Sequence, residues 1–428
     1  MQKQFQDCIL AFAKLNELKD KFRYYCQACG SYRNDTELLY LCPDCGPGTV
    51  KGKPPKGVMK IEYDYEGLRA KNLHLNQLSQ QQWLPLLPIE HIENLPNINP
   101  EKSPLFSVNS LDGKSLDNTI WLKDDTRQPT FSFKDRASAV VSAFAKERGM
   151  RQLVAASTGN AGSSLAGICA AQQQKAVIIV PAKAPLAKLT QILHYGARLV
   201  TVEGSYDDAF DLSVAASEHF GWYNRNTAFN PVTIEGKKTA AFELALQFNS
   251  RLPDRIFVPT GDGVILSGLY KGFEDLMKLN LIQKMPVLVA VQSALSNNLV
   301  RNLTSTSFTV QSSTTIADSI SVDIPRNFYM TKQYLTEYQG EWVQVEDAEI
   351  LSASSVLSRN TGLFAEPAAA AALAGYLVMQ RQGRIESGSN NVIMLTGSGL
   401  KDLASLQPML AMPAPVSPNI ESLKKLFA

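Results

Sequence analysis

The sequence predicts an α/β protein whose sheets are mainly parallel. From about residue 104 onward, short apolar runs alternate with segments of helical spacing, a pattern typical of parallel strands joined by crossover helices. Glycine-rich turns follow several of these runs, at the strand ends where such sheets bind ligands. A chain of 428 residues, 45% of them apolar and 19% charged, is typical of a globular protein with roughly two to three domains.

The predicted strands are rich in aliphatic residues and span 119–123, 153–157, 176–181, 198–203, 255–259, 286–292 and 392–396. The predicted helices between and around them span 137–147, 161–174, 186–195, 206–219, 238–249, 265–277 and 368–380. Residues 51–57 contain two prolines and are expected to form a linker. The polar segment 66–81 is expected to be helical at the surface.

Charge and hydropathy limit the kinds of partner. The net charge is +2, from 42 basic and 40 acidic residues without a long basic run, so we expect small-molecule partners and no nucleic acid. Residues 1–20 have the pattern of an amphipathic helix rather than a signal peptide, and no stretch resembles a membrane span. We therefore expect a cytoplasmic protein without a membrane partner.

Four cysteines near the N-terminus have the spacing of a zinc ribbon. Cys26 and Cys29 form one CxxC pair, and Cys42 and Cys45 form a second pair twelve residues further on. Two disulfides in an exported protein are the alternative, but no export signal precedes them. Four thiolates leave no vacant coordination position, so we expect a structural zinc ion. Cys8 and Cys169 lie in apolar helical settings and are expected in the core.

The segment from Thr130 to Arg136 places a lysine where a predicted strand gives way to a helix. Phe131 and Phe133 shortly precede Lys134, and their rings would partly desolvate its amine and favour the neutral, nucleophilic form. The next residues, Asp135 and Arg136, could hold the local chain in register. Such a lysine suits Schiff-base chemistry. The alternative is a surface lysine at the start of an ordinary amphipathic helix.

Two glycine-containing turns after predicted strands could bind anions. Ser157, Thr158, Gly159 and Asn160 precede a predicted helix, whose free N–H groups suit a carboxylate or a phosphate. The second turn, Gly261, Asp262, Gly263 and Val264, suits a phosphate if the carboxylate of Asp262 points away. An asparagine N-cap and a plain type II turn are the respective alternatives.

A third turn begins at Thr396 and continues into Gly397, Ser398 and Gly399. A hydroxyl group at this strand end would leave a heteroaromatic nitrogen largely unprotonated, whereas an aspartate would keep it charged. A glycine-rich turn without a ligand is the alternative. The polar loop from Asp318 to Arg326 also has two interpretations, as a wall of the substrate site or as a plain connection.

Six blocks resemble the threonine synthase branch of the type II pyridoxal-phosphate enzymes, the tryptophan synthase β family. They are FSFKDR around Lys134, STGNAG at 157–162, VEGSYDDA at 202–209, NPVTIEGKKTAAFE at 230–243, EPAAAAAL at 366–373 and TGSGLKD at 396–402. The resemblance implies two doubly wound parallel-sheet domains beside a small N-terminal zinc-ribbon segment. On this basis we expect residues 1–60 to form the helix and ribbon, 61–150 and 236–428 the large cofactor-binding domain, and 151–235 a small mobile domain.

The resemblance also implies a role for each candidate residue. Lys134 would form the Schiff base with pyridoxal phosphate, Asn160 would bind the pyridine hydroxyl, and Thr396 would face the ring nitrogen. The turn of Gly261, Asp262, Gly263 and Val264 would hold the cofactor phosphate. Substrate would bind at Ser157, Thr158, Gly159 and Asn160.

The implied reaction converts O-phosphohomoserine and water to threonine and phosphate, through an aldimine on Lys134. The alternatives are a serine or threonine dehydratase, a cysteate synthase-like enzyme acting on serine, threonine or phosphoserine, and a non-catalytic relative. A homodimer is expected by resemblance only. The family block NPxRxEGxKT has an arginine that binds the substrate phosphate, and this chain has Thr233 there and Ala228 at a position that often carries a hydroxyl. Other cations could take over this role, namely Lys183, Lys188, Arg225 or Lys237.

Overall fold

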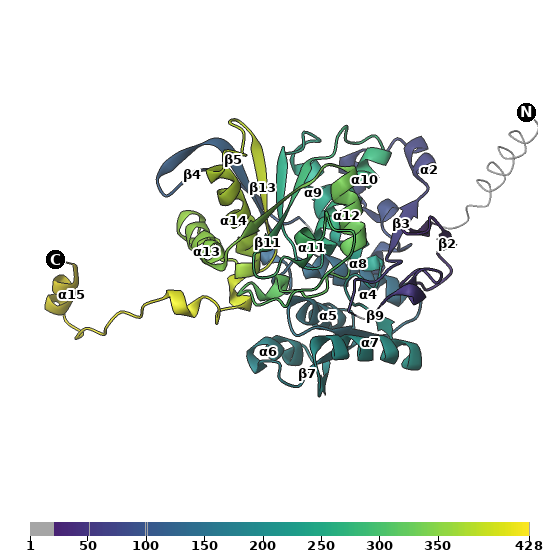
Figure 1. Cartoon of the computed structure of the whole chain (residues 1–428), viewed down its shortest axis with the longest axis horizontal. Helices are drawn as coiled ribbons and strands as arrows, with labels where there is room; N and C mark the ends of the chain where they lie inside the picture. The colour runs from purple at the N-terminus through teal and green to yellow at the C-terminus, as the bar shows by residue number, and fades with distance from the viewer. Residues whose placement is uncertain (1–20, 51, 99, 101, 428) are drawn as a thin grey trace, which may run out of the picture.

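The computed structural model describes residues 21–50, 52–98, 100 and 102–427, which form three sheets (Figure 1). The predicted helix at residues 1–20 and Cys8 lie outside this part of the chain. The largest sheet has the strand order β12-β11-β10-β13-β5-β4. Its strands are β4 (Leu105–Leu111), β5 (Lys114–Asp124), β10 (Arg255–Pro259), β11 (Val287–Ser293), β12 (Glu341–Val345) and β13 (Asn390–Leu395).

The second sheet has four parallel strands in the order β8-β7-β6-β9. They are β6 (Gln152–Ala156), β7 (Lys175–Pro181), β8 (Arg198–Val202) and β9 (Tyr223–Asn224). The large sheet is parallel too, except that β4 pairs antiparallel with β5. Each predicted strand is confirmed to within about three residues at its ends, apart from the longer β5. The strands β4, β9 and β12 escaped prediction because they lack a continuous apolar run, and β9 has only two residues.

Helices connect the strands and cover the sheets, and the α5–α7 group lies against the four-stranded sheet at the bottom of Figure 1. The N-terminal half contains α2 (Tyr65–Ala70), α3 (Leu75–Gln80), α4 (Lys134–Glu147), α5 (Asn160–Ala171), α6 (Leu186–His194) and α7 (Tyr206–Phe220). The rest contains α8 (Val232–Lys237), α9 (Thr239–Gln247), α10 (Val264–Lys278), α11 (Asn298–Arg301), α12 (Phe328–Glu337), α13 (Asp347–Thr361), α14 (Pro367–Arg381) and α15 (Ile420–Phe427). The polar segment 66–81, expected to be helical, forms the two short helices α2 and α3.

The third sheet belongs to the cysteine-rich segment and has the order β2-β1-β3. Its strands are β1 (Phe22–Cys26), β2 (Tyr32–Asn34) and β3 (Met59–Tyr63), all antiparallel. Buried polar contacts join β3 to the helices of the main body: Lys60 Nζ lies 3.0 Å from a carboxylate oxygen of Glu274, and the Tyr63 hydroxyl donates to Glu235. The predicted boundary at residue 60 falls inside β3, and the division into domains stays a prediction.

Helix α4, which begins with Lys134, packs closely against α8. A Cβ atom added at Gly236 of α8 would lie 2.2 Å from the carbonyl oxygen of Arg136 and 2.6 Å from the Cα of Ala137. Backbone atoms cannot give way as a flexible side chain can, so only glycine allows this approach. The contact holds the first turn of α4 in place.

We predict that Gly236→Ala lowers the free energy of unfolding by about 2 kcal/mol, because the added methyl group forces α4 and α8 apart. In a helix without this contact, alanine would be more favourable than glycine by about 1 kcal/mol. A net loss of stability would therefore be due to the contact between α4 and α8. Urea unfolding measures the change. Gly48→Ala is the control, since its Cβ would meet nothing within 4 Å. Equal stability of Gly236→Ala and the unmodified chain would contradict the prediction.

Candidate active site

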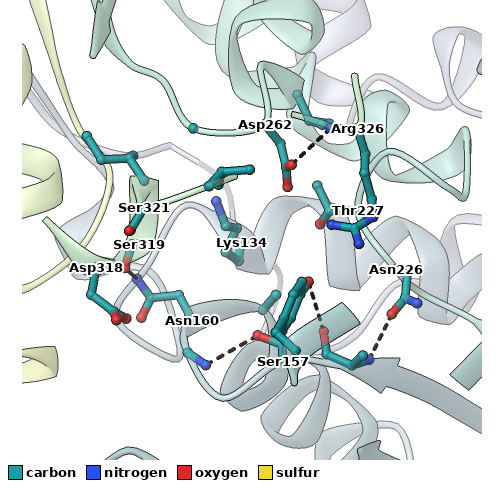
Figure 2. A pocket seen from close by; sticks show the side chains of 18 of the residues that line it. Lys134, Ser157, Asn160, Asn226, Thr227, Asp262, Asp318, Ser319, Ser321 and Arg326 are labelled. Atoms are coloured by element: carbon teal, nitrogen blue, oxygen red, sulfur yellow. Dashed lines mark hydrogen bonds between the residues drawn. The ribbon is translucent and has the colours of Figure 1, made fainter. Parts of the chain in front are cut away.

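A pocket of about 460 Å³ opens at the carboxyl ends of β6 and β10, between the two parallel sheets (Figure 2). Its lining comes from the first turn of α4, the turn 157–160, the turn 261–264 and the loop 318–326. Parallel α/β sheets bind ligands at this edge, because free backbone amides of the following helices collect there. The structure therefore brings together the lysine and two of the three glycine turns that the sequence singled out.

Lys134 is the first residue of α4 and lies in this pocket, with Asn160 on one side and Thr227 on the other (Figure 2). Its Nζ donates no hydrogen bond to any residue that the structure describes. Burial lowers the pKa of Lys134, and the charge of Arg225 lowers it further. The amine is therefore more often neutral, and more nucleophilic, than an ordinary lysine at neutral pH.

The predicted shielding of Lys134 by two phenylalanines is only half right. Phe133 is fully buried, whereas Phe131 is 44% exposed. Phe131 also has a φ of +70°, in the left-handed region that a bulky residue rarely adopts. Burial still lowers the pKa of the lysine, although one of the two phenylalanines is largely exposed.

The two residues after the lysine hold the start of α4, as predicted. Both carboxylate oxygens of Asp135 bind Thr130, and the backbone N–H of Thr130 donates at 2.6 Å. The guanidinium of Arg136 is completely enclosed and donates to Asp125 at 2.7 Å and to Glu243 at 2.6 Å. These contacts fix the backbone from which Lys134 projects.

The turn after β6 presents unsatisfied donors to the pocket. The backbone N–H groups of Thr158, Asn160 and Ala161 have no hydrogen-bond acceptor in the described part of the chain, and α5 begins at Asn160. The amide of Asn160 donates to the two carboxylate oxygens of Glu366 at 2.9 and 3.1 Å, and to Ser319 Oγ at 3.3 Å. Burial raises the pKa of Glu366. This turn can bind an anionic group of a ligand.

The turn after β10 has the same property at the start of the longer helix α10. Within the described residues, the backbone N–H groups from Gly261 to Val264 have no acceptor. Gly263 has a φ of +86°, and a Cβ there would lie 2.2 Å from Thr331 Oγ1, so the turn needs glycine. Free amides and the positive end of a helix suit a phosphate group.

Asp262 does not point away from the pocket. Its carboxylate lies on the same side as Lys134 in Figure 2, where Oδ1 accepts the backbone N–H of Arg326 at 3.2 Å. Burial raises the pKa of Asp262, whereas the positive charges of Arg326, Lys134 and Lys237 lower it. These cations offset the repulsion that the carboxylate would exert on a bound phosphate.

The third turn lies beside the lysine segment without lining the pocket. The N–H of Phe133 donates to the carbonyl of Thr396 at 2.9 Å, and the N–H of Ser398 donates to the carbonyl of Phe131 at 3.0 Å. Thr396 is buried at the end of β13 and is not among the pocket-lining residues that the structure describes. Its predicted contact with a ring nitrogen stays a prediction, as does the role of Asn160.

Several lining residues were not assigned a role from the sequence. The loop 318–326 had two interpretations, and the structure places Asp318, Ser319 and Arg326 in the pocket wall. Arg326 forms an ion pair with Asp207 of α7, and Lys188 of α6 lies 2.8 Å from Asp318. Thr227 also lines the pocket, shortly after β9, and no pattern in the sequence indicated that it would. Its position follows only from the pairing of β9 with β6.

The four cysteines of the N-terminal segment converge on one point. All of their Sγ atoms lie within 4.8 Å of one another. The Cys26–Cys45 and Cys29–Cys42 distances are 3.9 and 3.7 Å, far longer than a disulfide bond. Tetrahedral zinc with bonds of about 2.3 Å requires sulfur atoms about 3.8 Å apart. The cluster is thus compatible with a tetrahedral metal ion. Cys169 is buried, as expected.

Comparison with known proteins agrees with this geometry. The family described as pyridoxal-phosphate dependent enzyme matches residues 98–397. The threonine synthase of Methanocaldococcus jannaschii is 31% identical over 385 residues, covering 88% of this chain and 92% of its own. That of Methanosarcina acetivorans is 30% identical, covering 94% and 97%. Among solved structures, threonine deaminase isoform 2 of Solanum lycopersicum has a TM-score of 0.64 at 22% identity, covering 73% and 89%.

The fold is that of a type II pyridoxal-phosphate enzyme, and its pocket contains a lysine and two turns with free backbone amides. The chain belongs to the family of pyridoxal-phosphate dependent enzymes and is a threonine synthase-like lyase. The residues present fit the cofactor, because Lys134 has a free amine of lowered pKa and the turn 261–264 has free amides. No helix among the described residues is long and apolar enough to cross a membrane.

We predict that the purified protein absorbs visible light through bound cofactor and that Lys134→Ala abolishes this absorbance, because no other lysine among the described residues lines the pocket. Absorption spectra after addition of pyridoxal phosphate and gel filtration measure the effect. Lys146→Ala is the control on the same helix, since its ammonium bonds only to Gln172 at the surface. Covalently attached cofactor in Lys134→Ala would contradict the assignment.

The cysteine cluster predicts one zinc ion per chain and its loss in Cys42→Ser, because one thiolate of four is removed. Elemental analysis of dialysed protein measures the metal. Cys169→Ser is the matched control, since this buried cysteine lies in α5. The same zinc content in Cys42→Ser and the unmodified protein would show that the cluster is not the metal site.

Proposed function

We propose that this enzyme converts O-phosphohomoserine and water to threonine and phosphate, with pyridoxal phosphate bound at Lys134. The observation that carries the proposal is the amine of Lys134, which has no partner in the described part of the chain and shares a pocket with two turns of free backbone amides. Relatives that match nearly the whole chain bear the name threonine synthase, which supports this reaction over others of the family.

Each part of the pocket has a task in this reaction. The turn 157–160 would bind the carboxylate of the amino acid, and the turn 261–264 would hold the cofactor phosphate. Lys134 Nζ would carry protons to and from the α and β carbons of the substrate. Pyridoxal phosphate, when bound, supplies the sink for the electrons released at these carbons. The loop 318–326 would keep water out until it is needed.

A β-elimination reaction, such as that of a serine or threonine dehydratase, is the second candidate. One observation favours it: Thr233 stands at the position of the family's phosphate-binding arginine, and its buried hydroxyl donates to the carbonyl of Asn230 at 2.7 Å. Thr233 is not a lining residue of the pocket. A substrate without a phosphate would not need the missing arginine.

Four further proposals rest on the sequence and on the arrangement of the sheets. We propose that residues 151–235, which contain the four-stranded sheet, move relative to the remainder when substrate binds. Two ion pairs across the pocket, Arg326–Asp207 and Lys188–Asp318, would hold the closed position. We also propose that the cysteine cluster binds a structural zinc ion, that the protein is cytoplasmic and that it forms a homodimer.

An assay of four substrates tests the reaction. O-phosphohomoserine, phosphoserine, threonine and serine are each incubated with the holoenzyme, and phosphate, 2-oxo acid and threonine are measured. We expect phosphate and threonine in equal amounts from O-phosphohomoserine. Release of 2-oxo acid from serine or threonine, without turnover of O-phosphohomoserine, would establish the second candidate instead.

A further inference from the structure

This chain has Thr233 in place of the family's phosphate-binding arginine, so we asked which other basic side chain lies where it could bind a substrate phosphate. Of the four basic residues considered from the sequence, Lys183 is exposed and lies outside the pocket lining. Lys188 is paired with Asp318. Lys237 is buried in α8, where its Nζ lies 3.3 Å from the carbonyl of Thr233, and it does not line the pocket. Arg225 remains.

Arg225 is a buried cation without a counter-ion. Its guanidinium donates to Ser138 Oγ at 3.2 Å, to Thr227 Oγ1 at 2.7 Å and to the carbonyl of Lys134 at 3.5 Å. No carboxylate among the described residues lies within ion-pair distance of it, and burial lowers its pKa to about 10. By contrast, the equally buried Arg136 has two carboxylates. A buried charge of this kind is costly unless an anion compensates it.

Thr227 connects this charge to the pocket. Its Oγ1 accepts the N–H of Arg225, its own O–H has no acceptor among the residues that the structure describes, and the half-buried side chain lines the pocket opposite Asn160 (Figure 2). A hydroxyl that accepts from a cation becomes a stronger donor to an anion. Arg326 lines the same wall, with its guanidinium 4.1 Å from the ring centre of Phe210.

We propose that Thr227 and Arg225 form the subsite for the phosphate ester of the substrate. Thr227 donates the hydrogen bond, and Arg225 supplies the compensating charge from behind it. This subsite replaces the family's arginine and rests on the proposed function. It is separate from the turn 261–264, which holds the cofactor phosphate through backbone amides.

The test compares the affinity of the holoenzyme for O-phosphohomoserine and for homoserine, the same amino acid without the phosphate. Thr227→Val keeps the shape of the side chain and removes its hydroxyl. We therefore expect the affinity for O-phosphohomoserine to fall by about tenfold or more, and the affinities for homoserine and for the cofactor to stay unchanged. Thr336→Val is the control, because Thr336 is exposed on α12 and its hydroxyl donates to the carbonyl of Lys332 at 2.8 Å. An equal loss of affinity for both amino acids would overturn the proposal.

Arg225→Gln and Arg225→Lys test the charge. We expect Gln to raise KM for O-phosphohomoserine with little change in kcat, and Lys to restore part of the loss, which a merely structural role would not produce. A parallel loss of cofactor affinity in Arg225→Gln would assign the charge to the cofactor phosphate and overturn the proposal. Thr227→Val gives an independent result if Arg225→Gln does not fold.

Binding of inorganic phosphate distinguishes failure of the proposed reaction from failure of the proposed subsite. If the holoenzyme does not turn over O-phosphohomoserine, equilibrium dialysis with inorganic phosphate still tests the subsite. Binding to the unmodified holoenzyme that is lost in Thr227→Val and kept in Thr336→Val would support the subsite without the reaction. Equal binding to all three proteins would overturn it.

Discussion

The geometry of the site depends on the buried ion pairs that hold the first turn of α4. Arg136 binds both carboxylate oxygens of Glu243, at 2.6 and 3.0 Å, and Lys123 binds one of them at 2.6 Å. Although burial alone would raise the pKa of Glu243, these two cations hold it at about 2. The carboxylate therefore stays ionised at every physiological pH. Removing one partner of such a pair costs about 3–5 kcal/mol, because the other charge is left uncompensated.

Arg136 and Lys134 are two basic residues in the first turn of α4 with different roles, one structural and one chemical. Arg136 is satisfied by carboxylates of the chain, and its role is to position the helix. Lys134 has no partner for its amine among the described residues, and burial lowers its pKa. Burial of an unpaired amine is unfavourable for folding and useful for catalysis. The free amides of the turns 157–160 and 261–264 are unfavourable in the same way until anions bind to them.

The sequence was sufficient to predict the order of strands and helices in the main body. Continuous apolar runs, typical of buried strands, alternate there with segments whose apolar residues have helical spacing. The sequence also predicted the lysine junction, both amide turns and the cysteine cluster, since each is a local pattern. It could not predict the partners across the pocket. Glu366 beside Asn160 and Arg326 beside Asp262 are pairs far apart in the chain, and only the tertiary fold brings them together. Thr227 and Arg225 follow the two-residue strand β9, which is too short to give a sequence pattern. Phe131 failed as a shield, since its side chain is 44% exposed at a backbone position with φ of +70°.

The most direct test of the account is the site of covalent attachment of the cofactor. The holoenzyme is reduced with borohydride and digested, and the peptides are analysed by mass spectrometry. The account predicts that the mass of the reduced cofactor is found on the peptide containing Lys134 and on no other lysine. Attachment to Lys237, to Lys401 or to surface lysines at random would contradict it.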